Sequence, residues 1–92
     1  MKNITVNISK IAEKFFNKHT DIYSKFIENI KSIYHNNNHN IDIKAMKNYN
    51  NIYRMRIQKY RVIYKLINGE IIIIDILAAG SRGDIYKDFT NK

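Results

Sequence analysis

Hydrophobic and polar residues alternate in two ways along this chain, and each predicts a kind of element. From Lys2 to Ile8 every second residue is apolar, which is typical of a β-strand with one buried face. From Lys10 to Lys18, and from Thr20 to about His35, apolar residues recur every three or four positions, as in amphipathic helices. We expect Ser9 to cap the first helix and Thr20-Asp21 to cap the second.

The second half of the chain alternates with the period of a strand three times. The expected strands are Ile52–Ile57, Tyr60–Ile67 and Glu70–Leu77. Asn68-Gly69 between the last two is the strongest two-residue hairpin signal, whereas Gln58-Lys59 between the first two is a poorer turn pair. The three strands therefore form an antiparallel meander.

The segment between the helices and the meander is rich in asparagine and polar, and we expect Ile41 to Asn51 to form a loop with one helical turn. The element order is then β-α-α-β-β-β. This order predicts an α+β fold, with a twisted antiparallel sheet covered on one face by the N-terminal helix pair. With 92 residues and no proline, we expect one domain over residues 1–92.

The net charge of +8 and the pI of about 9.8 favour a polyanion, an acidic partner or a membrane surface as binding partner. The chain is also rich in Ile, Asn, Lys and Tyr, the composition of an AT-rich genome, so the position of the charges is better evidence than their total. No acidic residue occurs from Ile43 to Gly69. The basic residues within that window are Lys44, Lys47, Arg54, Arg56, Lys59, Arg61 and Lys65.

Several classes of protein are disfavoured by what the sequence lacks. The chain has no cysteine, so we expect neither disulfides nor thiol chemistry. Its N-terminus is too polar for a signal peptide, and no apolar run approaches the ~20 residues of a membrane span. His35 and His39 are spaced like half a metal site, but only Asp42 is near to complete it. We therefore expect a cytoplasmic protein with no metal, no cofactor and no membrane contact.

Arginine is concentrated where phosphate recognition would need it. Three of the four arginines lie between Tyr53 and Tyr64, although lysine is the commoner cation of this chain. The guanidinium fork binds phosphate bidentately, which lysine cannot do. Alternation places Arg54 and Arg56 on one face of their strand, and a two-residue turn would put Arg56 directly opposite Arg61. Like charges in that position destabilise a sheet unless an anion lies between them.

The predicted strand pairing also brings the last strand close to the arginines. Across a two-residue Asn68-Gly69 turn, Arg61 would pair with Ile76, near the strand end that leads to Arg82, so four guanidiniums would converge on one groove. On the helix-covered side we expect Asp75 and a buried pair, Tyr60 and Tyr64. The alternative is a solvated outer face whose arginine stems cover apolar surface. The absence of acidic residues from Ile43 to Gly69 favours an anion-binding site over this alternative.

Three motifs together resemble a known family. They are Tyr53-Arg54-x-Arg56-x-x-x-Tyr60-Arg61-Val62-Ile63-Tyr64, Asn68-Gly69-x-Ile71-x-Ile73, and Gly80-Ser81-Arg82-Gly83-Asp84-Ile85-Tyr86. With the preceding Ile43-Lys44-Ala45-Met46-Lys47, they resemble the RelE/ParE superfamily of toxin–antitoxin toxins. RelE-type mRNA interferases are the most similar branch. The strand and helix pair before them are also in the family's order.

The resemblance implies a ribosome-dependent endoribonuclease that cleaves mRNA in the A site by 2′-hydroxyl attack on the adjacent phosphate. It implies five catalytic residues, of which Arg54 and Arg56 stand where RelE has lysines; the others are Arg61, Arg82 and Tyr86. Those substitutions remove a lysine general base, and Gly83 stands where the family often has a second basic residue. Proton transfer could then use Lys47 or a group of the ribosome.

The implied partners are a cognate antitoxin, the ribosome and its mRNA. We expect the lysines of the basic window to contact RNA; these are Lys44, Lys47, Lys59 and Lys65. Three alternatives stay open: a ParE-like inhibitor of DNA gyrase, a catalytically weak nucleic-acid or antitoxin-binding module, and a plain basic interaction protein.

Overall fold

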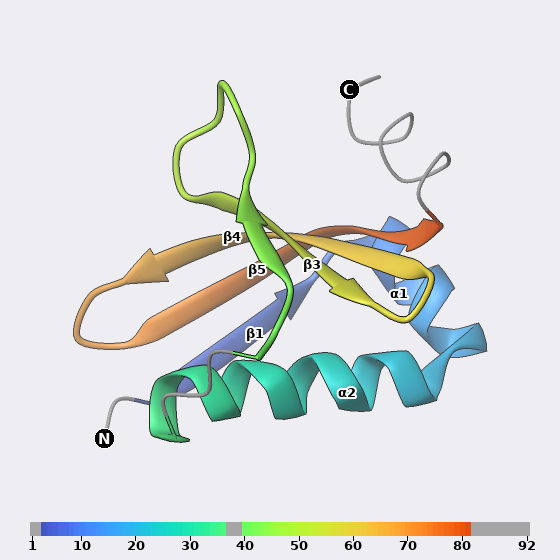
Figure 1. Cartoon of the computed structure of the whole chain (residues 1–92), viewed down its shortest axis with the longest axis horizontal. Helices are drawn as coiled ribbons and strands as arrows, with labels where there is room; N and C mark the ends of the chain where they lie inside the picture. Colours follow the sequence, from blue (N-terminus) through green and yellow to red (C-terminus); the bar gives the residue numbers. More distant parts are fainter. Residues whose placement is uncertain (1–2, 37–39, 82–92) are drawn as a thin grey trace.

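The computed structural model describes residues 3–36 and 40–81, which Figure 1 draws in colour. The elements are β1 (Ile4–Ile8), α1 (Lys10–Lys18), α2 (Thr20–Lys31), the π-helical turn η1 (Ser32–Asn36), β2 (Ile43–Ala45), β3 (Ile52–Ile57), β4 (Tyr60–Asn68) and β5 (Ile72–Ser81). The predicted α+β class is confirmed, and the bounds of β3 are those that the sequence predicts.

The strands form one five-stranded sheet in the order β1-β5-β4-β3-β2. Two details differ from the prediction. β1 pairs in parallel with β5, so the sheet is mixed rather than wholly antiparallel. The segment Ile43–Ala45, expected to be loop, is a short strand that pairs with β3. A parallel pair needs a long connection, and the chain between β1 and β5 supplies it.

The helices cover one face of the sheet, and the main core lies between these two layers (Figure 1). Phe26, Ile22 and Ile30 of α2 are at most 1% exposed and pack against buried sheet residues such as Met55 and Ile74. This burial follows from the three- and four-residue spacing of apolar positions in both helices. On the opposite face of the sheet, the described residues form a small apolar cluster around Ile63 and Ala78.

One helix cap is as predicted and the other is not. The Ser9 hydroxyl accepts a hydrogen bond from the Ala12 N–H at 3.2 Å and donates to the Leu77 carbonyl at 2.8 Å, which ties α1 to β5. The N-cap of α2 is His19, without a side-chain cap bond, rather than Thr20-Asp21. Its ring Nδ1 lies 3.0 Å from the Phe15 carbonyl, an acceptor only, so Nδ1 carries the hydrogen and is unavailable to the helix.

The turn between β3 and β4 has the two-residue form on which the arginine prediction rests. Gln58 has a positive φ of 56°, and Ile57 pairs with Tyr60. Arg56 is therefore directly opposite Arg61, as predicted. The even register also brings Val62 and Tyr64 onto the helix-covered face, where both are buried; Tyr60 is only half-buried.

The predicted pairing of Arg61 with Ile76 is wrong: Arg61 pairs with Gly80. Asn68 pairs with Ile72, so the connection has three residues instead of two. A register shift then follows between Ile63 and Tyr64, where Leu77 is the extra residue of β5. Such a β-bulge cannot be foreseen from the Asn-Gly signal, because it lies farther along the strands.

The bulge changes which residues of β5 face the helices. Before it, Ile74 and Ile76 lie in the main core; after it, Ala79 does, while Ala78 packs with Ile63 on the other face. Asp75 lies before the bulge and alternates with Ile74 and Ile76, so it lies on the opposite face. There it accepts a hydrogen bond from the Asn7 side-chain amide at 2.8 Å. The prediction that it points toward the helices is wrong because the connection after Asn68 is one residue longer than expected.

Burial of Tyr64 in β4 makes the free energy of unfolding vary with pH in the alkaline range. Burial, and then the neighbouring Tyr34 and Tyr53, raise the pKa of Tyr64 above its ordinary value of 10.0. The unfolded chain therefore loses this proton first, so the contribution to stability is complete below pH 10.0 and is lost as the pH rises further. Urea unfolding at about pH 8 and about pH 11 should show a smaller loss of stability for Tyr64→Phe than for the unchanged protein. An equal loss in both proteins would contradict this assignment.

Candidate functional site

The sheet face that the helices leave open carries a pair of adjacent arginines. Arg56 and Arg61 are direct cross-strand partners on β3 and β4, and both are at least partly exposed. Arg56 Nε donates to the Gln58 carbonyl and Arg61 Nη1 to the Lys59 carbonyl, each at 3.2 Å. These bonds hold both guanidinium groups at the β3–β4 turn. Each group retains further N–H donors, so the pair can bind an anion that offsets its own repulsion.

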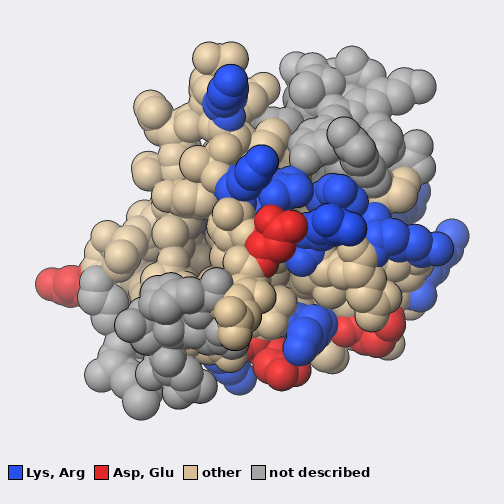
Figure 2. Space-filling model, viewed as in Figure 1, with Lys and Arg blue, Asp and Glu red and all other residues tan. Residues whose placement is uncertain are grey.

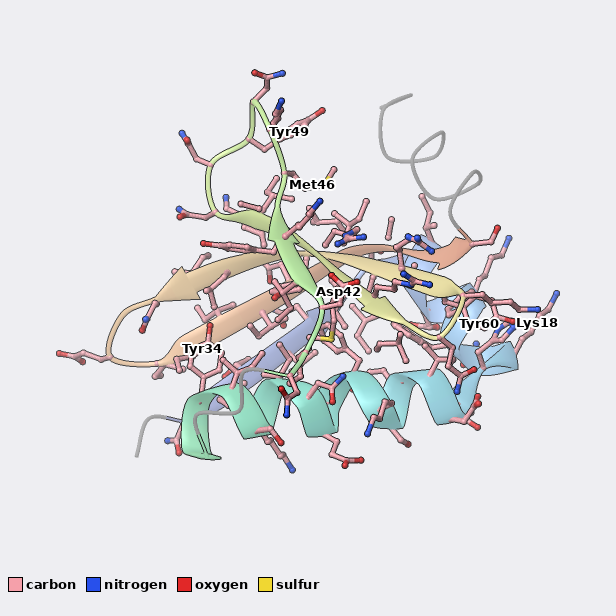
Figure 3. The ribbon with its side chains drawn as sticks, viewed as in Figure 1. Lys18, Tyr34, Asp42, Met46, Tyr49 and Tyr60 are labelled. Atoms are coloured by element: carbon pink, nitrogen blue, oxygen red, sulfur yellow. The ribbon has the colours of Figure 1, made fainter. Side chains whose placement is uncertain are left out.

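Arg54 lies on the same face but is bound differently. Its Nη2 donates to the Asp42 carboxylate at 2.9 Å, and its side chain is only 13% exposed. Its Nε is buried without a hydrogen-bond partner among the described residues. The Asp42 backbone carbonyl also accepts a hydrogen bond from the Arg56 backbone N–H, at 2.9 Å. Arg54 is thus anchored by Asp42, which Figure 3 labels just before β2, whereas Arg56 and Arg61 are held at the turn.

Asp42 was not among the residues predicted for this site. Its one signal was the alternation of Ile41, Asp42 and Ile43, which extends the strand-like pattern and places the carboxylate opposite its apolar neighbours. In the structure Ile43 pairs with Met55, so the residue before it reaches Arg56. Among the carboxylates of residues 3–36 and 40–81, Asp42 is the one within hydrogen-bonding distance of an arginine.

Replacing Asp42 with alanine is expected to lower the free energy of unfolding by about 1 kcal/mol. The substitution leaves a mostly buried guanidinium without its charged partner, a loss of roughly 1.5–3 kcal/mol for a buried bond, reduced here because the carboxylate is half exposed. Urea denaturation measures the change. Glu70→Ala, in the exposed β4–β5 loop, is the matched control with the same change in charge. Equal stability of the two variants would show that the ion pair contributes nothing.

The four lysines predicted to bind RNA do not lie together. Lys44 is opposite Arg54, and Lys59 lies in the turn with its Nζ 5.5 Å from the centre of the Tyr60 ring. Lys65 is opposite Ile52, and Lys47 lies in the loop before β3, so both are at the other end of that strand. Arg56 is four positions after Ile52 along the strand, which is about 13 Å. Lys47 is therefore not beside the arginine pair.

Two predicted catalytic residues, Arg82 and Tyr86, lie outside the described residues, as do Gly83 and His39. The last residue of β5, Ser81, pairs with Tyr60 next to the turn. Within residues 3–36 and 40–81, no group of His, Cys, Asp and Glu is arranged to hold a metal ion. No helix in this part of the chain is long and apolar enough to cross a membrane.

The charge distribution indicates which surface suits an anion. Figure 2 shows lysine and arginine groups gathered over β3 and β4 and extending to one side, with few carboxylates among them. A separate groove of about 660 Å³ lies between α2 and β3, with Arg56 in its lining. Asp21 and Asp42 also line that groove, so it is less suited to a polyanion than the open face of the sheet.

Comparison with known proteins finds a similarity among solved structures. No protein-family model and no curated protein sequence matches the chain. Among solved structures, the chain is similar to one chain of the RelB–RelE antitoxin–toxin complex from Methanococcus jannaschii. The sequences are 27% identical, the similarity covers 90% of this chain and 98% of the other, and the TM-score is 0.54. The chain therefore resembles the RelE/ParE toxin superfamily in its fold as well as in its motifs.

Proposed function

We propose that this chain is the toxin of a type II toxin–antitoxin module and an endoribonuclease that cleaves mRNA in the ribosomal A site. The observation that carries the proposal is the pairing of Arg56 with Arg61 on the open sheet face, with both guanidiniums held at the turn. A sheet that places like charges opposite each other is best explained by an anionic ligand. The similarity to a chain of an antitoxin–toxin complex supports the same class.

The proposed chemistry is an intramolecular transesterification at one phosphate of the RNA strand. The ribose 2′-oxygen attacks the adjacent phosphorus, the bond to the 5′-oxygen breaks, and the products are a 2′,3′-cyclic phosphate and a free 5′-hydroxyl. Arg56 and Arg61 stabilise the added negative charge on the phosphorane and on the leaving oxygen. Arg54 supports them from its anchored position. Arg82 is proposed to contact the same phosphate, and Tyr86 to stack on a base or align the attack.

Proton transfer requires a group other than these arginines, because a guanidinium hardly loses its proton. Lys47 lies at the far end of β3, so it is poorly placed to accept the proton from the 2′-hydroxyl. We assign this step, and delivery of a proton to the leaving 5′-oxygen, to groups of the ribosome, which also positions the codon. Free mRNA should accordingly be a poor substrate.

The proposed regulator is a cognate antitoxin. The RelB–RelE complex pairs an antitoxin with a toxin, and this chain presents a basic surface that an acidic or amphipathic segment can cover. The ribosome and its mRNA are the other proposed partners, in the cytoplasm.

Primer extension on translated mRNA tests the proposal. We expect cuts inside codons positioned in the A site, no cuts in the same mRNA without ribosomes, and loss of the cuts with Arg61→Ala. Absence of cuts together with a DNA-damage response would support gyrase inhibition instead. Ribosome binding without any cuts would identify a catalytically inactive binding module.

A further inference from the structure

Helix α1 carries a row of lysines that the proposed reaction does not use. Lys10, Lys14 and Lys18 are all exposed and recur every four residues, on the side away from the buried Ala12 and Phe16. Four residues of an α-helix rise about 6 Å. That interval is close to the separation of successive phosphates along one nucleic-acid strand. A row of lysines alone is commonly a solvated face, so its surroundings decide its meaning.

The row continues into the arginine pair because the end of α1 packs against the β3–β4 turn. The Phe15 and Tyr60 ring centres are 5.1 Å apart, and the His19 ring stacks on Phe15 at 4.2 Å with an angle of 9°. The His19 and Tyr60 ring centres are 4.8 Å apart. Lys59 extends over the Tyr60 ring on the same turn. Figure 3 shows Lys18 beside Tyr60, at this end of the molecule.

These contacts fix two charged surfaces relative to each other. The aromatic cluster joins α1 to the turn, and the turn carbonyls hold Arg56 and Arg61. In Figure 2 the basic groups accordingly form one band, from the centre of the sheet face to the side where α1 lies. We call the part beyond the arginine pair the lysine band; it consists of Lys10, Lys14, Lys18 and Lys59.

We propose that the lysine band binds the phosphate backbone of structured RNA next to the codon, and that it orients the protein on the ribosome. This inference rests on the proposed function. Lysine is a hydrated point charge, which suits contact with the phosphate backbone without recognition of the bases. The arginine pair has the forked groups that bind one phosphate bidentately. Each phosphate contact releases counterions, so binding should weaken with salt. An acidic antitoxin segment is the competing occupant; RNA is favoured because the band continues from the arginine pair, where the message is proposed to bind.

The test uses the whole chain and a pair of matched double variants. Lys14→Gln with Lys18→Gln removes two charges from the band, and Lys25→Gln with Lys31→Gln removes two exposed charges from α2. Affinity for ribosomes programmed with mRNA is measured over a range of salt concentrations, together with the cleavage rate at saturating ribosomes. The band variant should bind about 10-fold more weakly, with a salt slope smaller by roughly 1–2. Its rate at saturation should be unchanged, and the α2 variant should bind like the unchanged protein.

Equal binding by the two variants would overturn the proposal, and so would weaker binding of the band variant to the antitoxin but not to the ribosome. A lower saturated rate with unchanged affinity would also overturn it, because the lysines would then act in the reaction. The proposed function fails separately: if the unchanged protein makes no cuts while the band variant still loses ribosome affinity, the band stands without the nuclease. Equal thermal midpoints of both variants confirm that their folding is intact.

Discussion

Arg61→Ala is expected to lower the rate of mRNA cleavage on the ribosome by about 100- to 1,000-fold, the usual effect of removing one preorganised donor to a developing negative charge. Arg61 is the member of the arginine pair on the central strand β4, and its guanidinium is held by the Lys59 carbonyl. Its charge is therefore already in position before the phosphate arrives. Single-turnover cleavage at saturating ribosomes measures the effect on the chemical step apart from binding.

Two further variants make this result specific. Lys65→Ala removes an exposed charge from the same strand, far from the turn, and should leave the single-turnover rate within about twofold of the unchanged protein. Arg61→Lys keeps the charge but loses the fork, so its rate should fall between the other two. If Arg61→Ala cleaves as fast as Lys65→Ala, the arginine pair is not the catalytic centre.

Phe26→Ala should have the largest effect on stability, lowering the free energy of unfolding by about 3–5 kcal/mol. Phe26 is completely buried and its ring lies edge-on to Tyr64, with centres 5.4 Å apart and an angle of 70°. The substitution removes a large apolar side chain from the contact between α2 and the sheet. A chain of 92 residues has a small stability reserve, so the variant should be partly unfolded at 37 °C.

Urea denaturation followed by far-UV circular dichroism gives this free energy. Ile71→Ala is the control, because Ile71 is 49% exposed in the β4–β5 loop and should change stability by about 0.5 kcal/mol or less. A loss below about 1 kcal/mol for Phe26→Ala would mean that the helix layer packs loosely on the sheet.

Features that depend on neighbouring residues could be predicted from the sequence. Alternation fixed both faces of β3, and the two-residue turn at Gln58 placed Arg56 opposite Arg61. The Ser9 cap is equally local, since its acceptor bond is to Ala12. These features need only strand parity and helix spacing, which the sequence contains.

Features that depend on distant strands could not be predicted. The parallel pairing of β1 with β5 joins two ends of the described chain, and the β2 strand is only three residues long. The bond between Asp42 and Arg54 arises because β2 pairs with β3 in one register. No periodicity in either segment fixes that register. The extra residue of β5 likewise follows from how the two strands fit together.

That extra residue makes β5 two segments joined out of phase. Its first segment supplies large isoleucines to the helix layer, and its second brings Ala78 and Gly80 beside Ile63 and Arg61. Deleting Leu77 would close the bulge and leave the later residues on their present faces, because Ile76 and Ala78 already oppose the adjacent residues Tyr64 and Ile63. The deletion would instead remove the Leu77 carbonyl that accepts a hydrogen bond from the Ser9 hydroxyl, so the extra residue serves to join α1 to β5 rather than to set which side chains face the helices. One residue added to the exposed β4–β5 loop should be tolerated.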